Sequence, residues 1–253
     1  MSGTLFSLQG YIRLGEVDAA GKIGKMRWVG NVPEATLELS TSNTDKNESF
    51  SGKRLQIGRL ATGTTAALNL TLDYWSSANL ALGFQASLAD ITASTVTGEV
   101  FPAALVAGDQ IRLDHPFASA LVLTDSATTP ATVPPANYEL VGHGKNIVEM
   151  KNVGSLQQPF KAAYSYAAAE NIVLFSAPGK VVFLQFDGIN TETEEPVIID
   201  LWRTRFDPVS SLGLINQEYG NLALSAAVLY DTTRAADAAL GGFGRMLQKK
   251  AAG

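Results

Sequence analysis

Strict alternation of apolar and polar residues is the feature that most constrains the fold of this chain. The clearest run spans residues 66–74, whose apolar side consists of Ala66, Leu68, Leu70, Leu72 and Tyr74. Successive side chains of a strand point to opposite faces, so a period of two predicts a β-strand with one buried face. The same alternation recurs over residues 6–14, 160–166 and 222–230. We therefore expect a mostly β protein.

Only one helix stands out in the pattern. Ser76 or Ser77 offers an N-cap, and Leu80, Phe84 and Leu88 follow at a spacing of four. The expected fold is a β-sandwich or open barrel flanked by this short α-helix, with a long polar loop and a C-terminal extension. We expect residues 1–231 to form one β domain and residues 232–253 to form a tail, either flexible or docked.

The long polar stretch, residues 40–52, has Phe50 as its only large apolar residue. Loops of this length within a domain are uncommon and usually functional. Two interpretations are open: a mobile surface loop, or an arm that binds a partner and becomes ordered on assembly.

Composition excludes several classes of protein. The chain has no cysteine, which removes disulfide scaffolds, thiolate zinc sites and cysteine nucleophiles. Its formal charge of −5 argues against a general nucleic-acid binder. No apolar run reaches the roughly 18 residues of a membrane span. The first residues lack the pattern of a secretory signal, so we expect a protein that stays in the cytoplasm or leaves it without the secretory route.

Residues able to carry catalysis are scarce. His115 precedes a proline, His143 lies between two glycines in an expected turn, and no nucleophile elbow accompanies either of them. The acidic stretch 187–195 offers oxygen ligands for calcium but lacks the spacing of a known calcium loop, which favours a solvated hairpin tip. We therefore expect no enzyme activity, no cofactor and no metal site.

Two features could take part in contacts between molecules. Arg203 and Arg205 share the alternation of Val197, Ile199 and Leu201, and would either bind a carboxylate of a neighbouring subunit or point to water. The tail has apolar residues at helical spacing, but the three glycines at 241, 242 and 244 each cost about 1 kcal/mol in a helix. A frayed terminus and a docking helix are both compatible with this sequence.

The succession of segments resembles the tail tube proteins of bacteriophages with long, non-contractile tails (siphophage-like). The segments that carry the resemblance are residues 68–85, 99–100, 108–111, 181–190, 197–215 and the strand that ends at Asp231. The proline-bearing loop 125–136 and the alanine-rich tail depart from that pattern.

The resemblance implies a structural virion protein with no catalytic role. Six copies would form a ring and the rings would stack into a tube, with the tape measure protein in the lumen. A tail terminator and distal tail or baseplate proteins would bind the two ends. DNA would pass through during genome ejection without specific binding, and no membrane contact is expected. The protein would be found in the virion tail, and in the host cytoplasm during assembly.

The same resemblance assigns roles to individual residues. Candidates for the lumen wall are Thr36, Glu38, Asn69, Thr71 and Asp73. Candidates for contacts between rings are Asn43, Asp45, Lys46, Glu48 and Phe50. Candidates for contacts between subunits are Arg203, Arg205, Phe243 and Leu247. Six chains of charge −5 give about −30 per ring, a field that would keep phosphate from adhering to the wall.

Two other classes of function compete with this interpretation. A tail-tip, baseplate or carbohydrate- or receptor-binding β module would cluster aromatic residues on an exposed face, whereas Trp28, Trp75 and Trp202 are spread along the chain. A β-fold hydrolase would need grouped acid–base residues, which the sequence does not offer.

Overall fold

The computed structural model describes residues 5–18 and 20–249. The described chain is mostly β with antiparallel sheets and a single α-helix, as the alternation predicts. Two compact units divide it: unit 1 comprises residues 1–88 and 172–253, and unit 2 comprises residues 89–171. The region expected as one β domain thus contains a second unit inserted into the first.

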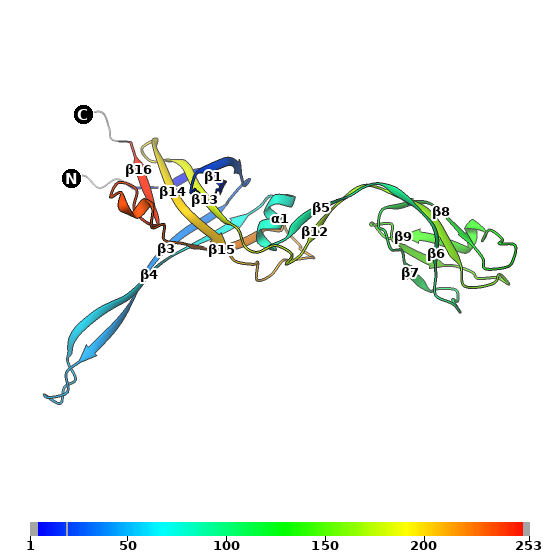
Figure 1. Cartoon of the computed structure of the whole chain (residues 1–253), viewed down its shortest axis with the longest axis horizontal. Helices are drawn as coiled ribbons and strands as arrows, with labels where there is room; N and C mark the ends of the chain where they lie inside the picture. The colour runs from blue at the N-terminus through cyan, green and yellow to red at the C-terminus, as the bar shows by residue number, and fades with distance from the viewer. Residues whose placement is uncertain (1–4, 19, 250–253) are drawn as a thin grey trace. The chain divides into compact units, whose positions relative to one another are not determined.

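Unit 1 is built on one eight-stranded sheet, which dominates its part of Figure 1. Seven strands follow the order β2-β1-β13-β14-β15-β4-β3, and β16 pairs with β14 beside that path. Their bounds are β1 Leu8–Val17, β2 Ile23–Trp28, β3 Glu34–Asn47, β4 Gln56–Leu72, β13 Val181–Asn190, β14 Glu195–Phe206, β15 Leu222–Val228 and β16 Gly244–Gln248. The path ends at β2 and at β3, which are not paired with each other.

The core of unit 1 lies on one face of this sheet. In β15 the buried and exposed residues alternate without exception, and the paired segment of β4 buries Ala66, Leu68, Leu70 and Leu72. β1, β13 and β14 add Ile12, Leu14, Leu184 and Leu201 to the same cluster. The alternation read from residues 66–74 therefore identifies the buried side correctly.

β3 and β4 continue far beyond the rest of the sheet. β15 covers β4 only over residues 66–72, whereas β3 and β4 pair from Glu34↔Thr71 out to Asn47↔Gln56. Residues 40–65 form a two-stranded hairpin, which we call the arm, and it projects from the sheet at the lower left of Figure 1. The prediction of a loop over residues 40–52 was wrong, because residues 40–47 belong to strand β3 and the turn lies between Asn47 and Gln56.

Helix α1, Ser77–Gly83, follows β4 and is capped by Ser76, whose hydroxyl accepts a hydrogen bond from the Asn79 backbone N–H at 3.3 Å. The expected cap and the burial of Leu80 are confirmed. Leu88 does not belong to the helix, because the chain enters strand β5, Ser87–Ile91, four residues after the helix ends.

The C-terminal segment is neither frayed nor helical as far as Lys249. A short 3₁₀ turn, Arg234–Ala236, leads to strand β16, which pairs with β14 from Val197↔Gln248 to Leu201↔Gly244. Gly244 permits this pairing, because a Cβ there would lie 2.2 Å from the Asp200 carbonyl oxygen. Lys250 and residues 251–253 lie outside the described residues.

Unit 2 has its own core and two three-stranded sheets, ordered β7-β10-β9 and β6-β11-β8. Leu113, Leu123, Val148 and Phe160 are fully buried in it. Strands β5 and β12 carry the chain out of unit 1 and back, and pair with each other. The remaining bounds are β6 Ser94–Val100, β7 Gln110–Arg112, β8 Ala118–Thr124, a 3₁₀ turn Pro135–Asn137, β9 Tyr138–Val141, β10 Ile147–Met150, β11 Lys161–Tyr166 and β12 Ala169–Val173.

Candidate functional site

The side of the sheet opposite the core presents small and polar residues across three strands. Register places Thr36 beside Asn69 and Asn69 beside Ser225, and the next row joins Glu34, Thr71 and Ala223. Glu38 accepts a hydrogen bond from the Asn69 side chain at 3.1 Å. We call this surface the polar face; its members are Glu34, Thr36, Glu38, Ala67, Asn69, Thr71, Ala223, Ser225 and Ala227.

The structure brings four of the five lumen candidates together on the polar face: Thr36, Glu38, Asn69 and Thr71. All of them are exposed except Thr71, which is half-buried. Asp73 lies just beyond the end of β4, where it accepts a hydrogen bond from the Asn31 side chain at 2.6 Å. Each of these residues is thus open to water in the single chain.

Arg205 extends the polar face by one strand, because it pairs with Ala227, which in turn pairs with Ala67. The alternation of the sequence predicts that Arg203 and Arg205 lie on the same strand face as Leu201, and this prediction was wrong. A bulge sets Trp202 and Arg203 against the single residue Phe183, and the extra residue reverses the side of everything after it. Leu201 stays in the core whereas Arg205 is exposed.

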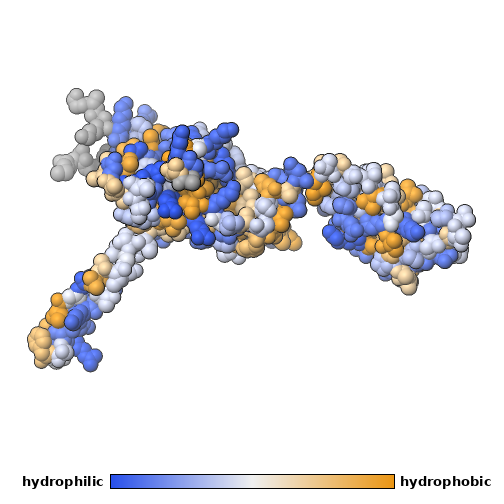
Figure 2. Space-filling model, in the orientation of Figure 1, coloured by the Kyte–Doolittle hydropathy of each residue, from blue (hydrophilic) through white to orange (hydrophobic). Residues whose placement is uncertain are grey.

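The arm is exposed on both of its faces. Between residues 40 and 65 every residue is exposed except Glu48 at the tip. Four of the five ring-contact candidates, Asn43, Asp45, Lys46 and Phe50, are therefore open to solvent. The exposed apolar residues of the arm are Phe50, Leu55, Ile57 and Leu60, and Figure 2 shows apolar surface near its far end.

Glu48 holds the tip in a defined shape. Its carboxylate accepts hydrogen bonds from the backbone N–H groups of Phe50 (2.8 Å), Ser51 (2.7 Å) and Leu55 (3.3 Å), and from the Ser51 hydroxyl. These donors, the Ser51 hydroxyl above all, lower the pKa of Glu48 to about 2. The turn is thus ordered by its own carboxylate, and Phe50, 84% exposed, stands out from it.

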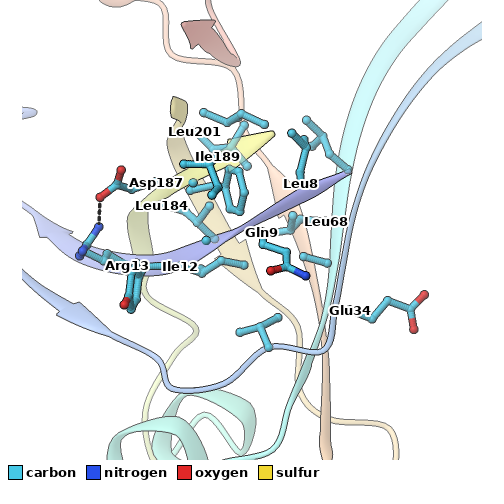
Figure 3. Close-up of a pocket in the computed structure, with 18 of the residues that line it drawn as sticks. Leu8, Gln9, Ile12, Arg13, Glu34, Leu68, Leu184, Asp187, Ile189 and Leu201 are labelled. Atoms are coloured by element: carbon cyan, nitrogen blue, oxygen red, sulfur yellow. Dashed lines mark hydrogen bonds and ion pairs between the residues drawn. The ribbon is translucent and has the colours of Figure 1, made fainter. Parts of the chain in front are cut away.

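A cleft opens between β1 and β3 on the core side of unit 1 (Figure 3). Its cavity volume is ≈ 1090 Å³. The floor is the apolar core itself, with Ile12, Leu68, Leu184 and Leu201 among the residues drawn. Leu8, Leu37 and Ile189 remain 38–44% exposed in its walls. The sheet thus leaves part of its core open to water at the place where its two ends fail to pair.

Both strands beside the cleft have free hydrogen-bonding edges among the described residues. β3 ends the sheet, and β2 with Val29 covers β1 only from Ile12 to Val17, which leaves the stretch Leu8–Tyr11 uncovered on that side. The Arg13 guanidinium donates to the Asp187 carboxylate at 2.6 Å at the rim (Figure 3). Exposed strand edges of this kind are normally protected in monomeric proteins.

Three exposed aromatic rings gather on unit 1, which the spread of tryptophans along the chain did not indicate. Trp28 makes edge-to-face contacts with Tyr11, at 5.7 Å between ring centroids, and with Tyr74, at 5.8 Å. About half of each side chain is exposed. Trp202 does not join them, since it is buried beneath the tail. Pairing of β1 with β2 creates the cluster, so only knowledge of that pairing could have found it.

The tail is anchored to the sheet around Trp202. The indole N–H donates to the Gly241 carbonyl at 3.0 Å, and the guanidinium groups of Arg234 and Arg245 lie 4.8 and 5.4 Å from the ring centroid. Phe243 is half-buried against Tyr230 within the same unit, whereas Leu247 is 44% exposed on β16. Of the subunit-contact candidates, Leu247 and Arg205 offer the most free surface.

Both histidines lie in unit 2. The ring of His115 stacks on Tyr166 at 4.1 Å, and its backbone N–H donates to the Tyr164 hydroxyl. Burial and the hydrogen bond to Glu99 raise the pKa of Tyr164 to about 12. His143 lies in the turn between β9 and β10. Over the described ranges no three acidic or histidine side chains are placed to hold a metal ion, and the stretch 187–195 ends in a hairpin turn as expected.

No helix in the described part of the chain has the length and apolarity needed to cross a bilayer. Unit 1 and unit 2 thus define a two-unit, antiparallel β protein with an open-edged sheet. Residues 5–247 match the family described as "Protein of unknown function UCP028589", and the chain belongs to that family. No curated protein matches the chain.

Proposed function

We propose that this protein is a self-assembling tube subunit, the tail tube protein of a bacteriophage with a long, non-contractile tail. The observation that carries the proposal is the unclosed sheet of unit 1, whose outer strands β2 and β3 have free edges within the described residues, and whose arm extends past the sheet. An exposed edge is a template for pairing with another chain. A head-to-tail contact between two different edges closes into a ring when the rotation permits, and stacking makes a tube.

The arm supports the same proposal on energetic grounds. A two-stranded hairpin that packs against nothing is marginally stable in water. The arm keeps its pairing over residues 40–47 although both of its faces are bare, and it exposes four large apolar side chains. Contact with a neighbouring subunit would bury that surface and stabilise the arm.

The polar face supplies a wall suited to a DNA channel. Its small side chains leave few apolar groups to adhere to a sliding polymer, and Glu34 and Glu38 are the charged residues of its outer strand. In a hexamer with a formal charge of about −30, carboxylates enclosed by low-dielectric walls would repel phosphate. The tape measure protein, the tail terminator, distal tail proteins and location in the virion belong to the same proposal.

Electron microscopy of the purified full chain tests the proposal. We expect rings or tubes of uniform bore. The variant Leu39→Lys places a charge on the free edge of β3, where Leu39 is 72% exposed, and should leave the protein folded but monomeric. Leu214→Lys, at an 87% exposed loop position, is the matched control and should still assemble. A wild-type protein that stays monomeric at all concentrations would refute the proposal.

The aromatic cluster of Tyr11, Trp28 and Tyr74 favours a second candidate, a carbohydrate- or receptor-binding module of the tail tip. Exposed aromatic rings are common in recognition surfaces because they bury large area at low entropic cost. Glycan-array binding that Trp28→Ala abolishes, by a protein that forms no polymer, would favour this candidate over the tube.

A further inference from the structure

We propose that the cleft of unit 1 is the socket for the arm tip of a second copy of this chain. This inference rests on the proposed self-assembly and specifies which two surfaces meet. The cleft presents Leu8, Leu37 and Ile189, and the tip presents Phe50, Leu55 and Ile57. Both surfaces thus expose large apolar side chains in the single chain.

The open shape of the cleft and the strand edges beside it suit a polypeptide segment. Ligand pockets usually have volumes of roughly 300–1000 Å³ with a closed, largely preformed lining. The cleft, at ≈ 1090 Å³, lies at the upper end of that range, and it is an open groove beside two strands rather than a closed pocket. The uncovered edges of β3 and of Leu8–Tyr11 can hydrogen-bond to the backbone of an inserted segment, while the floor takes its apolar side chains.

The arm cannot fill the cleft of its own chain. From Ser40 to Asn47 the arm runs about 23 Å at the rise of a strand, and this carries the tip away from the sheet. Folding back would require the ladder between β3 and β4 to break. The occupant must therefore come from another molecule.

Charge also matches the two surfaces. At the tip, the ionised carboxylate of Glu48 is held by hydrogen bonds of its own turn, and Asp45 pairs with Arg59 at 3.1 Å, while three further cations are exposed and outnumber the one remaining anion. These cations are Lys46, Lys53 and Arg54. The lining of the cleft includes the carboxylate of Glu34 at the start of β3, while its other carboxylate, that of Asp187, is paired with Arg13. Opposite charges at such a rim steer association and fix orientation.

Preorganisation favours the tip as the inserted element. The hydrogen bonds to Glu48 fix the turn before any partner arrives, so little conformational entropy remains to be lost when Phe50 is buried. A flexible loop of the same composition would lose much more.

The absence of native cysteine makes the contact directly measurable. Phe50→Cys and Ile189→Cys are purified separately, mixed and mildly oxidised, and we expect a covalent heterodimer. The matched control replaces Ile189→Cys with Ile215→Cys, a 96% exposed position outside both surfaces, and should give at least tenfold less product. Electron microscopy of unmodified protein from the same conditions reports assembly independently.

Each outcome of these experiments supports or overturns the socket, the tube proposal or both. Rings or tubes without preferential linkage of residues 50 and 189 would overturn the socket and leave the tube proposal standing. Linkage without rings or tubes would support the socket and refute the tube. Efficient linkage of Ile189→Cys to itself would mean that two clefts face each other, which would overturn the socket. A protein that never associates would overturn both.

A charge reversal gives a second measurement. Arg54→Glu should slow linkage of residues 50 and 189 about two- to fivefold at low salt, with a smaller effect at high salt. Lys180→Glu, which reverses an exposed cation on unit 1 away from the arm, should leave the rate unchanged. Equal rates for both variants would overturn the electrostatic part of the inference.

Discussion

Loss of the Arg245 side chain should destabilise unit 1 by about 2–3 kcal/mol. Arg245 donates to the Asp200 carboxylate at 2.9 Å across the β14–β16 ladder, and Asp200 is only 3% exposed. The variant Arg245→Ala leaves this buried carboxylate without its cation. Breaking a buried ion pair costs about 3–5 kcal/mol.

Two features of the structure reduce the expected cost. The Gln185 side chain still donates to Asp200 at 3.0 Å, and Arg245 itself is 34% exposed, so water can replace part of the interaction. The variant also loses the contact between the Arg245 guanidinium and the Trp202 ring, which raises the expected cost by about 0.5–1 kcal/mol. For a unit of this size the total corresponds to a fall in Tm of about 5–10 °C.

Tryptophan fluorescence during thermal or urea unfolding measures this change selectively, because Trp28, Trp75 and Trp202 all lie in unit 1. Adding Asp200→Asn to Arg245→Ala removes the stranded charge and should recover part of the loss. Lys180→Ala is the control: its pair with Glu16 is 3.3 Å long and largely exposed, so it should cost at most about 0.5 kcal/mol. An equally small effect of Arg245→Ala would refute the reasoning that β16 is a structural strand.

Three further predictions concern other parts of the chain. Asn79→Ala should destabilise unit 1 by about 1–3 kcal/mol in fluorescence-monitored unfolding, since the buried amide donates to the Val29 carbonyl at 2.7 Å. Leu123→Ala should lower the stability of unit 2 by about 2–5 kcal/mol, seen by hydrogen exchange, without moving the tryptophan transition. The pKa of Asp231 is lowered to about 2, first by the Thr233 hydroxyl and then by Arg234, so its stabilisation is complete above pH 4 and disappears toward pH 2. The stability difference between wild type and Asp231→Asn should therefore vanish over that interval, and a difference independent of pH would contradict this.

The sequence was sufficient to predict the β class and the buried face of the central strands. In β4 and β15 one side of each strand meets the core and the other meets water, so composition and burial alternate together. The helix cap at Ser76 could also be predicted, because it depends only on residues next to it in the sequence. Four lumen candidates lie on one surface because the alternation of side chains along a strand fixes the face on which each residue lies. Their role in a lumen remains a proposal.

What the sequence could not provide depends on pairing between distant segments. A single bulge opposite Phe183 reverses the side of Arg205, and nothing in the composition of β14 marks it. Residues 40–47 lack alternation because both faces of the arm are solvated, so a strand there resembles a loop. In the tail, three glycines suggested fraying, yet Gly244 is the residue that lets β16 approach Asp200.

The pairing of β5 with β12 brings together the two ends of the segment that forms unit 2, so the chain leaves unit 1 and returns to it along neighbouring strands. A graft that keeps this two-stranded base would need only closely spaced ends, the condition under which foreign domains are usually accepted. Residues 89–171 could thus be exchanged for another folded domain, in evolution or by design, while the sheet of unit 1 is retained.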